Sequence, residues 1–279
     1  MGLREDGGMS KVSVAAAVCQ FAPTNDRAHN LTYIGEQVAL ASERGADLVV
    51  FPEYSSFFVD KLGPQMRAHA EPLDGPFVSA LQALAAENAV TIVAGLVEAT
   101  GDEHVQNTVV AVDHAGLRAR YRKLHLYDAF GQQESDWVRA GEIEEPEVFE
   151  IGGLRLGLMT CYDLRFPEVA RTLADAAVDV IVVPAEWVRG PLKEHHWLTL
   201  LQARAIENTA FVVAADHPAP IGVGQSAVID PQGVRIAGVG AAEGMAIAHL
   251  DPALVQKTRS ANPVLQQRRY RVVPNESMN

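Results

Sequence analysis

Cysteine is scarce in this sequence. The 279 residues include only two, Cys19 and Cys161, and they do not form a CxxC pair. Two thiols are too few for the disulfide framework of a small secreted protein, and the commonest zinc-ligand spacing is missing. We therefore expect a cytoplasmic protein with no metal site.

Positive charge is also in short supply. The chain has 23 Lys and Arg residues against 35 Asp and Glu residues, which gives a formal net charge of −12. Nucleic-acid binding needs clustered cations facing the phosphates, so a nucleic-acid partner is not expected. No apolar run approaches the roughly 20 residues that a membrane-spanning helix requires, and we expect no membrane partner either.

Short apolar runs that alternate with helical periods predict an α/β protein. Strands are expected at 12–21 and in "LVVFPE", and a helix in "NLTYIGEQVALASER". A second helix is expected to begin after Asp74-Gly75, because Pro76 is favoured in a first helical turn.

An internal sequence repeat predicts how these elements assemble. "GADLVVFPEY" resembles "AVDVIVVPAEW", "ENAVTIVAG" resembles "ENTAFVVAA", and "AVDHAG" resembles "VIDPQG", in the same order along the chain. Chance recurrence of short elements is the alternative, but three ordered pairs favour two pseudo-symmetric halves. We predict a four-layer αββα sandwich with the active site between strand ends of both halves. Residues 1–10 are expected to form a flexible leader, and 11–279 a single domain.

Three chemically complementary side chains are expected at strand ends. Cys161 follows the strand "LRLGLMT" and precedes a helix that begins near Pro167, Glu53 closes "DLVVFPE", and Lys123 lies where a strand passes into a loop. A thiol, a carboxylate and an ammonium suffice for covalent acyl transfer without histidine. Taken singly, each has a simpler interpretation as a core thiol or a solvated charge. Cys19, in mid-strand, is assigned no function.

The motifs "VVFPEY", "YRKLHLYD" and "CYDLRFPE", in this order, resemble those of the nitrilase superfamily of carbon–nitrogen hydrolases. The resemblance runs from about residue 12 to 269. It implies that Glu53 is the general base, Lys123 the oxyanion stabiliser and Cys161 the nucleophile, with the backbone N–H of Tyr162 as a second oxyanion contact. It also implies that Glu134, in "GQQESDWVRAG", positions the substrate.

Within this family, "CYDLRFPE" resembles the amidase branch that includes ω-amidases and deaminated glutathione amidases. The resemblance implies cofactor-free hydrolysis of a small linear carboxamide through a thioester, with release of ammonia, by a homodimer or larger homo-oligomer. An N-carbamoyl amino acid amidohydrolase and a non-catalytic binding member of the fold are the alternatives. Ala140-Gly141 and Gly224-Gln225-Ser226 depart from the family pattern, so the surrounding loops are less transferable.

Substrate contacts are expected in the segment "PAEWVRGPLKEHHW". Trp187 and Arg189 are the candidates for substrate binding, although Arg189 and Lys193 are also typical of solvated loop charges. Arg165 has two interpretations, an ion pair with Glu168 or a substrate contact. Neighbouring histidines in this segment point about 100° apart on a helix and cannot act as i, i+4 metal ligands.

Overall fold

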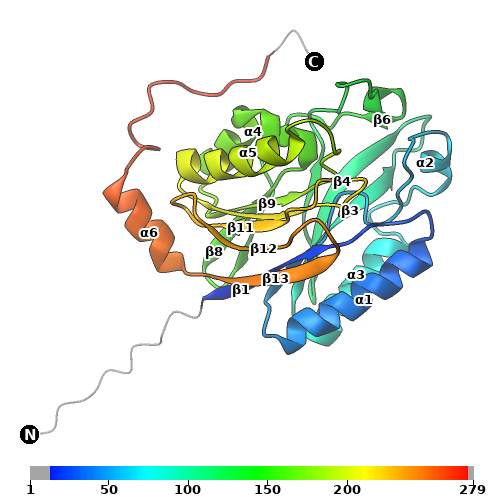
Figure 1. Ribbon diagram of the computed structural model, residues 1–279, viewed down its shortest axis with the longest axis horizontal. Helices are drawn as coiled ribbons and strands as arrows, with labels where there is room; N and C mark the ends of the chain where they lie inside the picture. The colour runs from blue at the N-terminus through cyan, green and yellow to red at the C-terminus, as the bar shows by residue number, and fades with distance from the viewer. Residues whose placement is uncertain (1–12, 276–279) are drawn as a thin grey trace, which may run out of the picture.

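The computed structural model describes residues 13–275, so the expected leader at residues 1–10 lies outside the described residues. Two sheets form the centre of the molecule (Figure 1). The first has the order β13 (Gly244–Leu250), β1 (Val14–Gln20), β2 (Leu48–Val50), β3 (Thr91–Ala99), β4 (Val105–Asp113) and β5 (Gly116–Arg122), and the short β6 (Val138–Arg139) pairs with β4. The second has the order β12 (Arg235–Gly238), β11 (Ala227–Ile229), β10 (Phe211–Ala215), β9 (Val180–Pro184), β8 (Leu154–Leu158) and β7 (Val148–Ile151).

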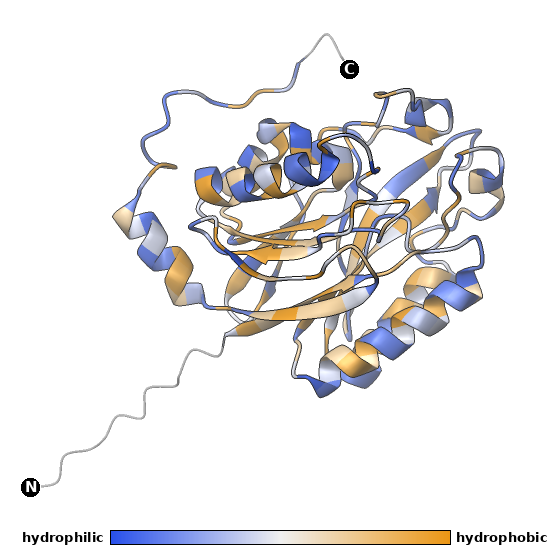
Figure 2. Cartoon of the chain, in the orientation of Figure 1, coloured by the Kyte–Doolittle hydropathy of each residue, from blue (hydrophilic) through white to orange (hydrophobic). Residues whose placement is uncertain are grey.

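Helices cover the outer face of each sheet. The core between the first sheet and its helices α1 (Arg27–Glu43) and α3 (Pro76–Asn88) is one cluster, and the core between the second sheet and α4 (Pro167–Asp175) and α5 (Lys193–Asn208) is another. A third cluster joins the inner faces of the two sheets. In Figure 2 the strands are mainly hydrophobic, whereas α1 and α5 carry hydrophilic patches. The predicted αββα sandwich is therefore confirmed.

The remaining elements are short or peripheral: α2 (Gln65–Ala68), the 3₁₀ turns η1 (Glu134–Asp136) and η2 (Cys161–Arg165), and α6 (Pro252–Ala261).

The residues of the internal sequence repeat lie at equivalent positions in the two sheets. Asp47 precedes β2, and its Oδ2 accepts a hydrogen bond from Ala15 N at 2.8 Å. Asp179 precedes β9, and its Oδ2 accepts from Arg155 N at 3.1 Å. In each half, the aspartate fixes the start of a central parallel strand against its neighbour, because the carboxylate satisfies an otherwise free backbone donor. The three parallel strands β1–β2–β3 thus match β8–β9–β10.

Gly95 in β3 sets the path of the chain that carries Glu53. A Cβ atom at this position would lie 2.3 Å from the backbone N of Tyr54 and 2.7 Å from Cα of Glu53. We predict that Gly95→Ala lowers the free energy of unfolding by about 1–3 kcal/mol, because the packed backbone must shift, and that it lowers activity by displacing Glu53. Urea unfolding and activity assays measure both effects.

Gly240→Ala is the matched control, because a Cβ at that glycine meets no atom within 4 Å. Equal stability of the two variants would contradict the assignment of Gly95 as a close-contact position.

Candidate active site

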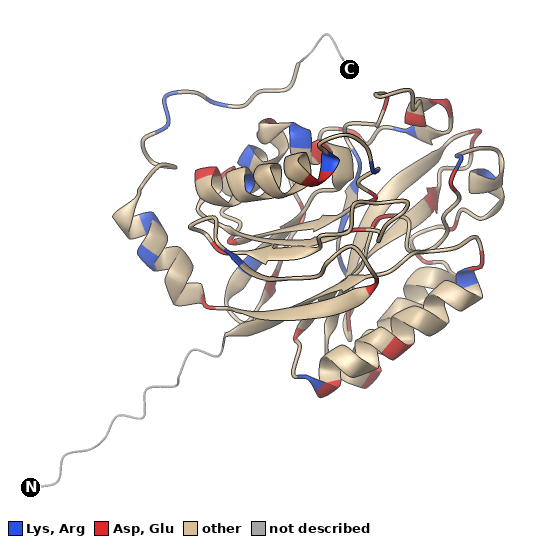
Figure 3. Cartoon of the chain, viewed as in Figure 1, with Lys and Arg blue, Asp and Glu red and all other residues tan. Residues whose placement is uncertain are grey.

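The ends of β2 and β5 and the turn η1 bring three charged side chains together in the interior. Lys123, directly after β5, is 2% exposed. Its Nζ lies 2.9 Å from Glu53 Oε1 and 2.9 Å from Glu134 Oε2. Figure 3 shows the strands of both sheets as largely uncharged. Buried charges persist only when they are paired and hydrogen-bonded, as these are.

Neutral donors complete the coordination of the two carboxylates. Asn107 Nδ2, from β4, donates to Glu53 Oε1 at 2.6 Å and to Glu134 Oε1 at 3.0 Å. The Tyr54 hydroxyl donates to Glu134 Oε1 at 2.6 Å, and the backbone N of Tyr127 donates to Glu134 Oε2 at 2.6 Å. Glu134 is thereby held more firmly than Glu53 and is suited to orient the ammonium.

The electrostatics of the cluster favour the ionised forms. Burial by itself lowers the pKa of Lys123. The negative charges of Glu134 and Glu53 have the larger combined effect, so the pKa is held well above its ordinary value. Burial by itself raises the pKa of Glu134. The positive charge of Lys123 and the hydrogen bonds to the carboxylate have the larger combined effect, so the pKa is lowered. At neutral pH Lys123 is therefore a cation and Glu134 an anion, since each charge stabilises the other.

The thiol of Cys161 lies beside this cluster, at the first residue of η2. Cys161 adopts φ of 46°, a left-handed conformation that a residue with a Cβ avoids. Such strain, typically about 1–3 kcal/mol, persists where the surrounding structure imposes it, often at functional sites. The thiol donates to the carbonyl oxygen of Glu186 at 3.3 Å, and the N–H of Glu186 donates to Glu53 Oε2 at 2.7 Å. One peptide segment therefore links the thiol to the carboxylate.

Two hollows meet at Cys161. The larger has a volume of about 450 Å³, and Lys123, Glu134, Cys161, Glu186 and Arg189 are among the residues that line it. The smaller, about 10 Å³, is lined by Tyr127, Cys161, Tyr162, Arg165, Glu186, Trp187, Val188 and Lys193. A small molecule of a few carbon atoms can thus reach the thiol from the larger cavity, whereas the smaller one has room for at most about one water molecule.

The predicted substrate contacts occupy different surroundings. Trp187 is buried, and its indole N–H donates to the carbonyl of Lys193 at 3.0 Å, so it forms the wall of the smaller cavity. Arg189 lines the larger cavity, is exposed, and lies 3.6 Å from Glu194. Both residues remain predicted contacts, with Trp187 more enclosed than Arg189.

The expected solvation of Lys193 is wrong. Its side chain is 5% exposed, and Nζ donates to the Tyr127 hydroxyl at 2.8 Å and lies 4.3 Å from the ring centre of Phe130. The possible ion pair between Arg165 and Glu168 is also not among the contacts of residues 13–275. Arg165 instead lies over the ring of Trp187, 4.8 Å from its centre.

Sequence reasoning missed four residues at this site: Tyr54, Asn107, Tyr127 and Glu186. Asn107 alone offered a signal, because an amide inside the apolar strand "VQNTVVAVD" needs a buried partner. Tyr54 follows Glu53 but has φ of 57°, so its direction cannot be read from strand alternation. Tyr127 and Glu186 each act through both backbone and side chain.

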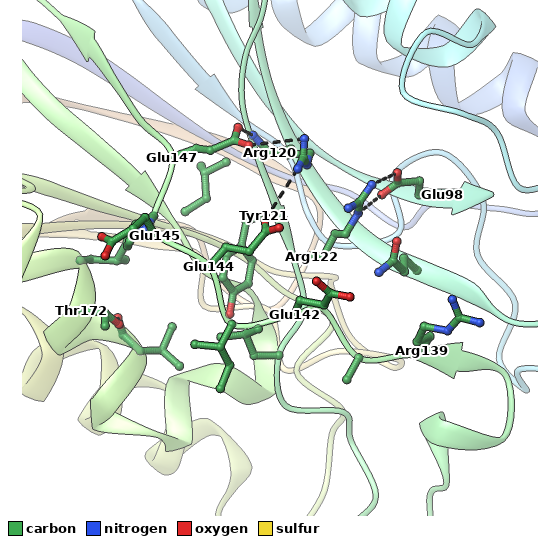
Figure 4. A pocket seen from close by; sticks show the side chains of 18 of the residues that line it. Glu98, Arg120, Tyr121, Arg122, Arg139, Glu142, Glu144, Glu145, Glu147 and Thr172 are labelled. Carbon is green, nitrogen blue, oxygen red and sulfur yellow. Dashed lines mark hydrogen bonds and ion pairs between the residues drawn. The ribbon is translucent and has the colours of Figure 1, made fainter. Parts of the chain in front are cut away.

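A second cavity, of about 400 Å³, lies away from the thiol, beside β5 and α4. Its arginines are already neutralised: Arg122 makes two hydrogen bonds to Glu98, at 2.5 and 2.8 Å, and Arg120 lies 3.5 Å from Glu147 (Figure 4). Of the described residues that line it, none is Cys, Ser, His or Lys. It therefore has no thiol or amine nucleophile, and the hollows at Cys161 are the better candidate.

Among residues 13–275, no group of three or more His, Cys, Asp and Glu side chains is arranged to hold a metal ion. No helix in this described range is both long and apolar enough to cross a membrane.

Comparison with known proteins agrees with this geometry. Residues 15–260 match the carbon–nitrogen hydrolase family model. The chain is 40% identical over 254 residues to a deaminated glutathione amidase of Escherichia coli, covering 91% of this chain and 97% of that one. It is 33% identical over 271 residues to the mouse (Mus musculus) protein of that name, covering 91% and 82%.

Solved structures give the same result. A variant of the nitrilase-superfamily amidase from Nesterenkonia AN1 superposes with a TM-score of 0.79 at 29% identity, covering 94% of this chain and 97% of that one. Another variant of that amidase carries the acetamide moiety of fluoroacetamide on its active-site cysteine. The chain belongs to the carbon–nitrogen hydrolase family, within the nitrilase superfamily, and is an amidase.

Proposed function

We propose that this amidase hydrolyses a small linear carboxamide of the ω-amide type through a thioester on Cys161 and releases ammonia. The observation that carries the proposal is the link from the Cys161 thiol through Glu186 to Glu53, which is itself paired with Lys123. In the Nesterenkonia amidase the acetamide moiety of fluoroacetamide adds covalently to the active-site cysteine, which supports a nucleophilic role for Cys161 here.

The proposed first half-reaction forms the thioester. Sγ of Cys161 bonds to the amide carbon as its proton moves to Glu53, and the oxyanion is stabilised by Lys123 and the backbone N–H of Tyr162. The C–N bond then breaks, and Glu53 gives its proton to the departing nitrogen, which leaves as ammonia. In the second half-reaction, water adds to the thioester and gives a proton to Glu53. Breaking the C–S bond then frees the acid, and the proton returns to Sγ.

The proton transfer to Glu53 is needed because the resting thiol is neutral. Burial, and then the negative charge of Glu53, raise the pKa of Cys161 well above its ordinary value, against the opposing effect of Lys123. A neutral thiol is a poor nucleophile, so its deprotonation must accompany attack on the substrate. Glu134, held by its own donors, orients Lys123 toward the oxyanion and does not need to exchange a proton.

Two cations in the smaller cavity support a substrate that carries a carboxylate. No Asp or Glu within residues 13–275 forms an ion pair with Arg165 or Lys193. Nε of Arg165 is buried without a hydrogen-bond partner, which is costly unless a ligand supplies one. Burial, and then Arg165, lower the pKa of Lys193. An anion that contacts them would relieve both effects, and the ω-amide of a dicarboxylic acid carries one. Because the cavity they share is only about 10 Å³, side chains must move to admit it.

Ammonia release tests the proposal directly. Purified protein is assayed with ω-amides of short dicarboxylic acids, neutral amides of matched length, N-carbamoyl amino acids and aliphatic nitriles. Preferential release from the ω-amides is expected. Preference for the carbamoyl amino acids would make the chain an N-carbamoyl amidohydrolase. An intact fold that turns over none of these compounds would favour a non-catalytic binding role.

Replacing Arg165 with methionine is expected to raise KM for an acidic ω-amide by about 10–100-fold, because a charged hydrogen bond contributes about 1.5–3 kcal/mol. Methionine keeps apolar contact with Trp187. KM for a neutral amide of equal length should change less than about threefold, because that substrate has no carboxylate whose contact with Arg165 is lost. Steady-state kinetics with the two substrates measure the difference.

Arg189→Met is the matched comparison, since Arg189 is exposed and near Glu194. A larger effect at Arg189 than at Arg165 would assign the carboxylate to the larger cavity instead.

The cytoplasmic location and the homodimer remain predictions. Fractionation of cells and sedimentation of the purified chain would test them.

A further inference from the structure

The imidazole ring of His217 is a buried titratable group that has no part in the two half-reactions. His217 follows β10 in the second sheet, and its side chain is 0% exposed. Its Nε2 lies 2.8 Å from the main-chain carbonyl oxygen of Glu53, which follows β2 in the first sheet. Among residues 13–275, no other group donates a hydrogen bond to that carbonyl oxygen. The ring therefore connects one half of the sandwich to the general base in the other half.

The contact with a carbonyl oxygen determines the tautomer of the ring. A carbonyl oxygen can only accept a hydrogen bond, so Nε2 carries the hydrogen and donates it. Nδ1 is buried and has no hydrogen-bond partner among the described residues. Burial lowers the pKa of His217 to about 4, although the hydrogen bond to Glu53 opposes this effect. At neutral pH the ring is therefore a neutral donor and adds no charge to the site.

The surroundings of His217 hold the ring in one orientation. The N–H of Gly224 donates to the His217 carbonyl at 2.9 Å, and a Cβ at Gly222 would lie 2.3 Å from that carbonyl oxygen. The Phe58 ring meets the imidazole edge to face, with 4.7 Å between the ring centres. A donor on such a rigid support holds its acceptor in a defined place, because neither the ring nor its backbone can move away easily.

The main chain at Glu53 needs this support. Glu53 lies beyond the end of β2, outside the ladder of strand hydrogen bonds, and Tyr54 after it has φ of 57°. A buried carbonyl group at this bend would carry a desolvation cost if it had no donor. His217 supplies the donor, and it thereby fixes the direction in which the Glu53 side chain leaves the backbone.

Proton transfer depends on how precisely that direction is set. Cys161 belongs to the second half of the sandwich and Glu53 to the first. The second half holds Glu53 at two points, because the N–H of Glu186 donates to its Oε2 at 2.7 Å and His217 donates to its carbonyl oxygen. The thiol donates to the carbonyl of the same Glu186 peptide segment. A displacement of about 1 Å at a reacting group can lower a rate about 100-fold, so both contacts matter for catalysis.

We propose that His217 is a positioning residue for amide hydrolysis, whose neutral ring holds the main chain of Glu53 so that its carboxylate faces the proton of Cys161. This inference rests on the proposed thioester mechanism, in which Glu53 is the general base. His217 is not among the residues that line either hollow at Cys161. It therefore acts on kcat through Glu53 and not through contact with the substrate.

Two replacements separate the N–H donor of the ring from its bulk. Leucine fills much of the same space without donating, whereas glutamine carries an amide N–H at about the distance of Nε2. In His217→Leu, kcat should fall about 10–100-fold, because Glu53 is misplaced, while KM changes less than about threefold. His217→Gln should recover most of kcat. Steady-state ammonia release from the amide that wild type hydrolyses fastest measures both parameters.

His69→Leu is the matched control for the loss of a histidine. The ring of His69 also packs on an aromatic ring of the same segment, that of Phe57, with 4.2 Å between the ring centres. Unlike His217 it is exposed, and its ring nitrogens have no hydrogen-bond partner in the part of the chain that the structure describes. Its kcat should stay within about twofold of wild type. Circular dichroism and urea unfolding establish that all three variants are folded at the assay temperature.

The pKa of the Cys161 thiol gives a readout that does not depend on turnover. The titratable groups that face this thiol are Glu53, Lys123, Tyr127, Glu186 and Lys193. Burial and then the negative charge of Glu53 raise the pKa of Cys161. A displaced Glu53 raises it less and leaves Lys123 less neutralised, so the thiol pKa should be lower in His217→Leu and return in His217→Gln. The pH dependence of alkylation by iodoacetamide, with the label located by mass spectrometry, measures this pKa.

Three outcomes would overturn the inference. Wild-type kcat in His217→Leu would show that Glu53 does not need the contact. A loss in His217→Gln as large as in His217→Leu would show that the shape of the ring matters and its N–H does not. An unchanged thiol pKa in His217→Leu would show that Glu53 has stayed in place.

Failure of the proposed function gives a different result. If wild type hydrolyses no ω-amide, but the thiol pKa falls in His217→Leu and returns in His217→Gln, the substrate class is wrong and the positioning of Glu53 stands. If wild type hydrolyses ω-amides and His217→Leu does so at the same rate, the positioning alone is wrong.

Discussion

Replacing Cys161 with alanine is expected to lower kcat for amide hydrolysis by at least about a thousandfold, because removing a covalent nucleophile leaves only binding and oxyanion stabilisation. The fold should survive, since the site is at a turn between β8 and α4. Ammonia release measures the loss. Mass spectrometry of protein quenched during turnover should show the acyl group on wild type and not on the variant.

A second cysteine in the chain provides a control for the Cys161→Ala experiment. Cys19 is the other cysteine of the chain, and it lies buried in the middle of β1. Burial alone raises the pKa of Cys19 far above its ordinary value, so this thiol is unreactive. Cys19→Ala should retain acylation and turnover, with at most a modest loss of stability. Turnover that persists in Cys161→Ala at the wild-type rate would rule out the thioester route.

The fold could be predicted because its two halves repeat local rules. Asp47 and Asp179 each precede a short apolar strand and each fix a backbone donor of the neighbouring strand, so similar sequence produces similar structure twice. The positions of Glu53, Lys123 and Cys161 at strand ends followed from the same alternation of apolar runs and polar breaks. Long-range burial and strand order then brought the three residues together.

Other parts of the site depend on backbone geometry that composition does not reveal. Lys193 resembles a solvated charge in sequence, but Leu192 before it has φ of 60°, and this left-handed residue is 67% exposed. The turn directs Leu192 outward and Lys193 beneath Tyr127 and Phe130. A bulky residue rarely adopts that conformation, so no propensity predicts it.

The position of Glu186 could not be predicted for a different reason. Its importance arises from a main-chain segment that contacts Cys161 and Glu53 at once, and these residues are distant in the chain. Such a contact exists only after both sheets have packed. Sequence patterns report which residues are apolar or polar, but they do not report which carboxyl group lacks a hydrogen-bond donor.

Replacing Lys123 with methionine is expected to combine a catalytic and a stability effect. Loss of an oxyanion stabiliser typically lowers kcat about 10²–10³-fold. The buried carboxylates Glu53 and Glu134 also lose their only ion-pair partner among the described residues, which costs about 3–5 kcal/mol of unfolding free energy near neutral pH. Lys257→Met, at an exposed position on α6, removes the same charge and should change stability by less than about 0.5 kcal/mol.

The pH dependence of this loss distinguishes a broken charge cluster from general damage to packing. In wild type, the lowered pKa of Glu134 contributes stability that is present above its unfolded pKa of about 4.3 and disappears as pH falls through the lowered value. Without Lys123, burial raises the carboxyl pKa instead, so the folded variant takes up protons that the unfolded chain does not. Its stability should therefore increase as pH falls from about 8 toward 5, and the gap to wild type should narrow. Urea unfolding across this range measures the gap, and a gap that stays constant would show that Lys123 contributes through packing and not through its charge.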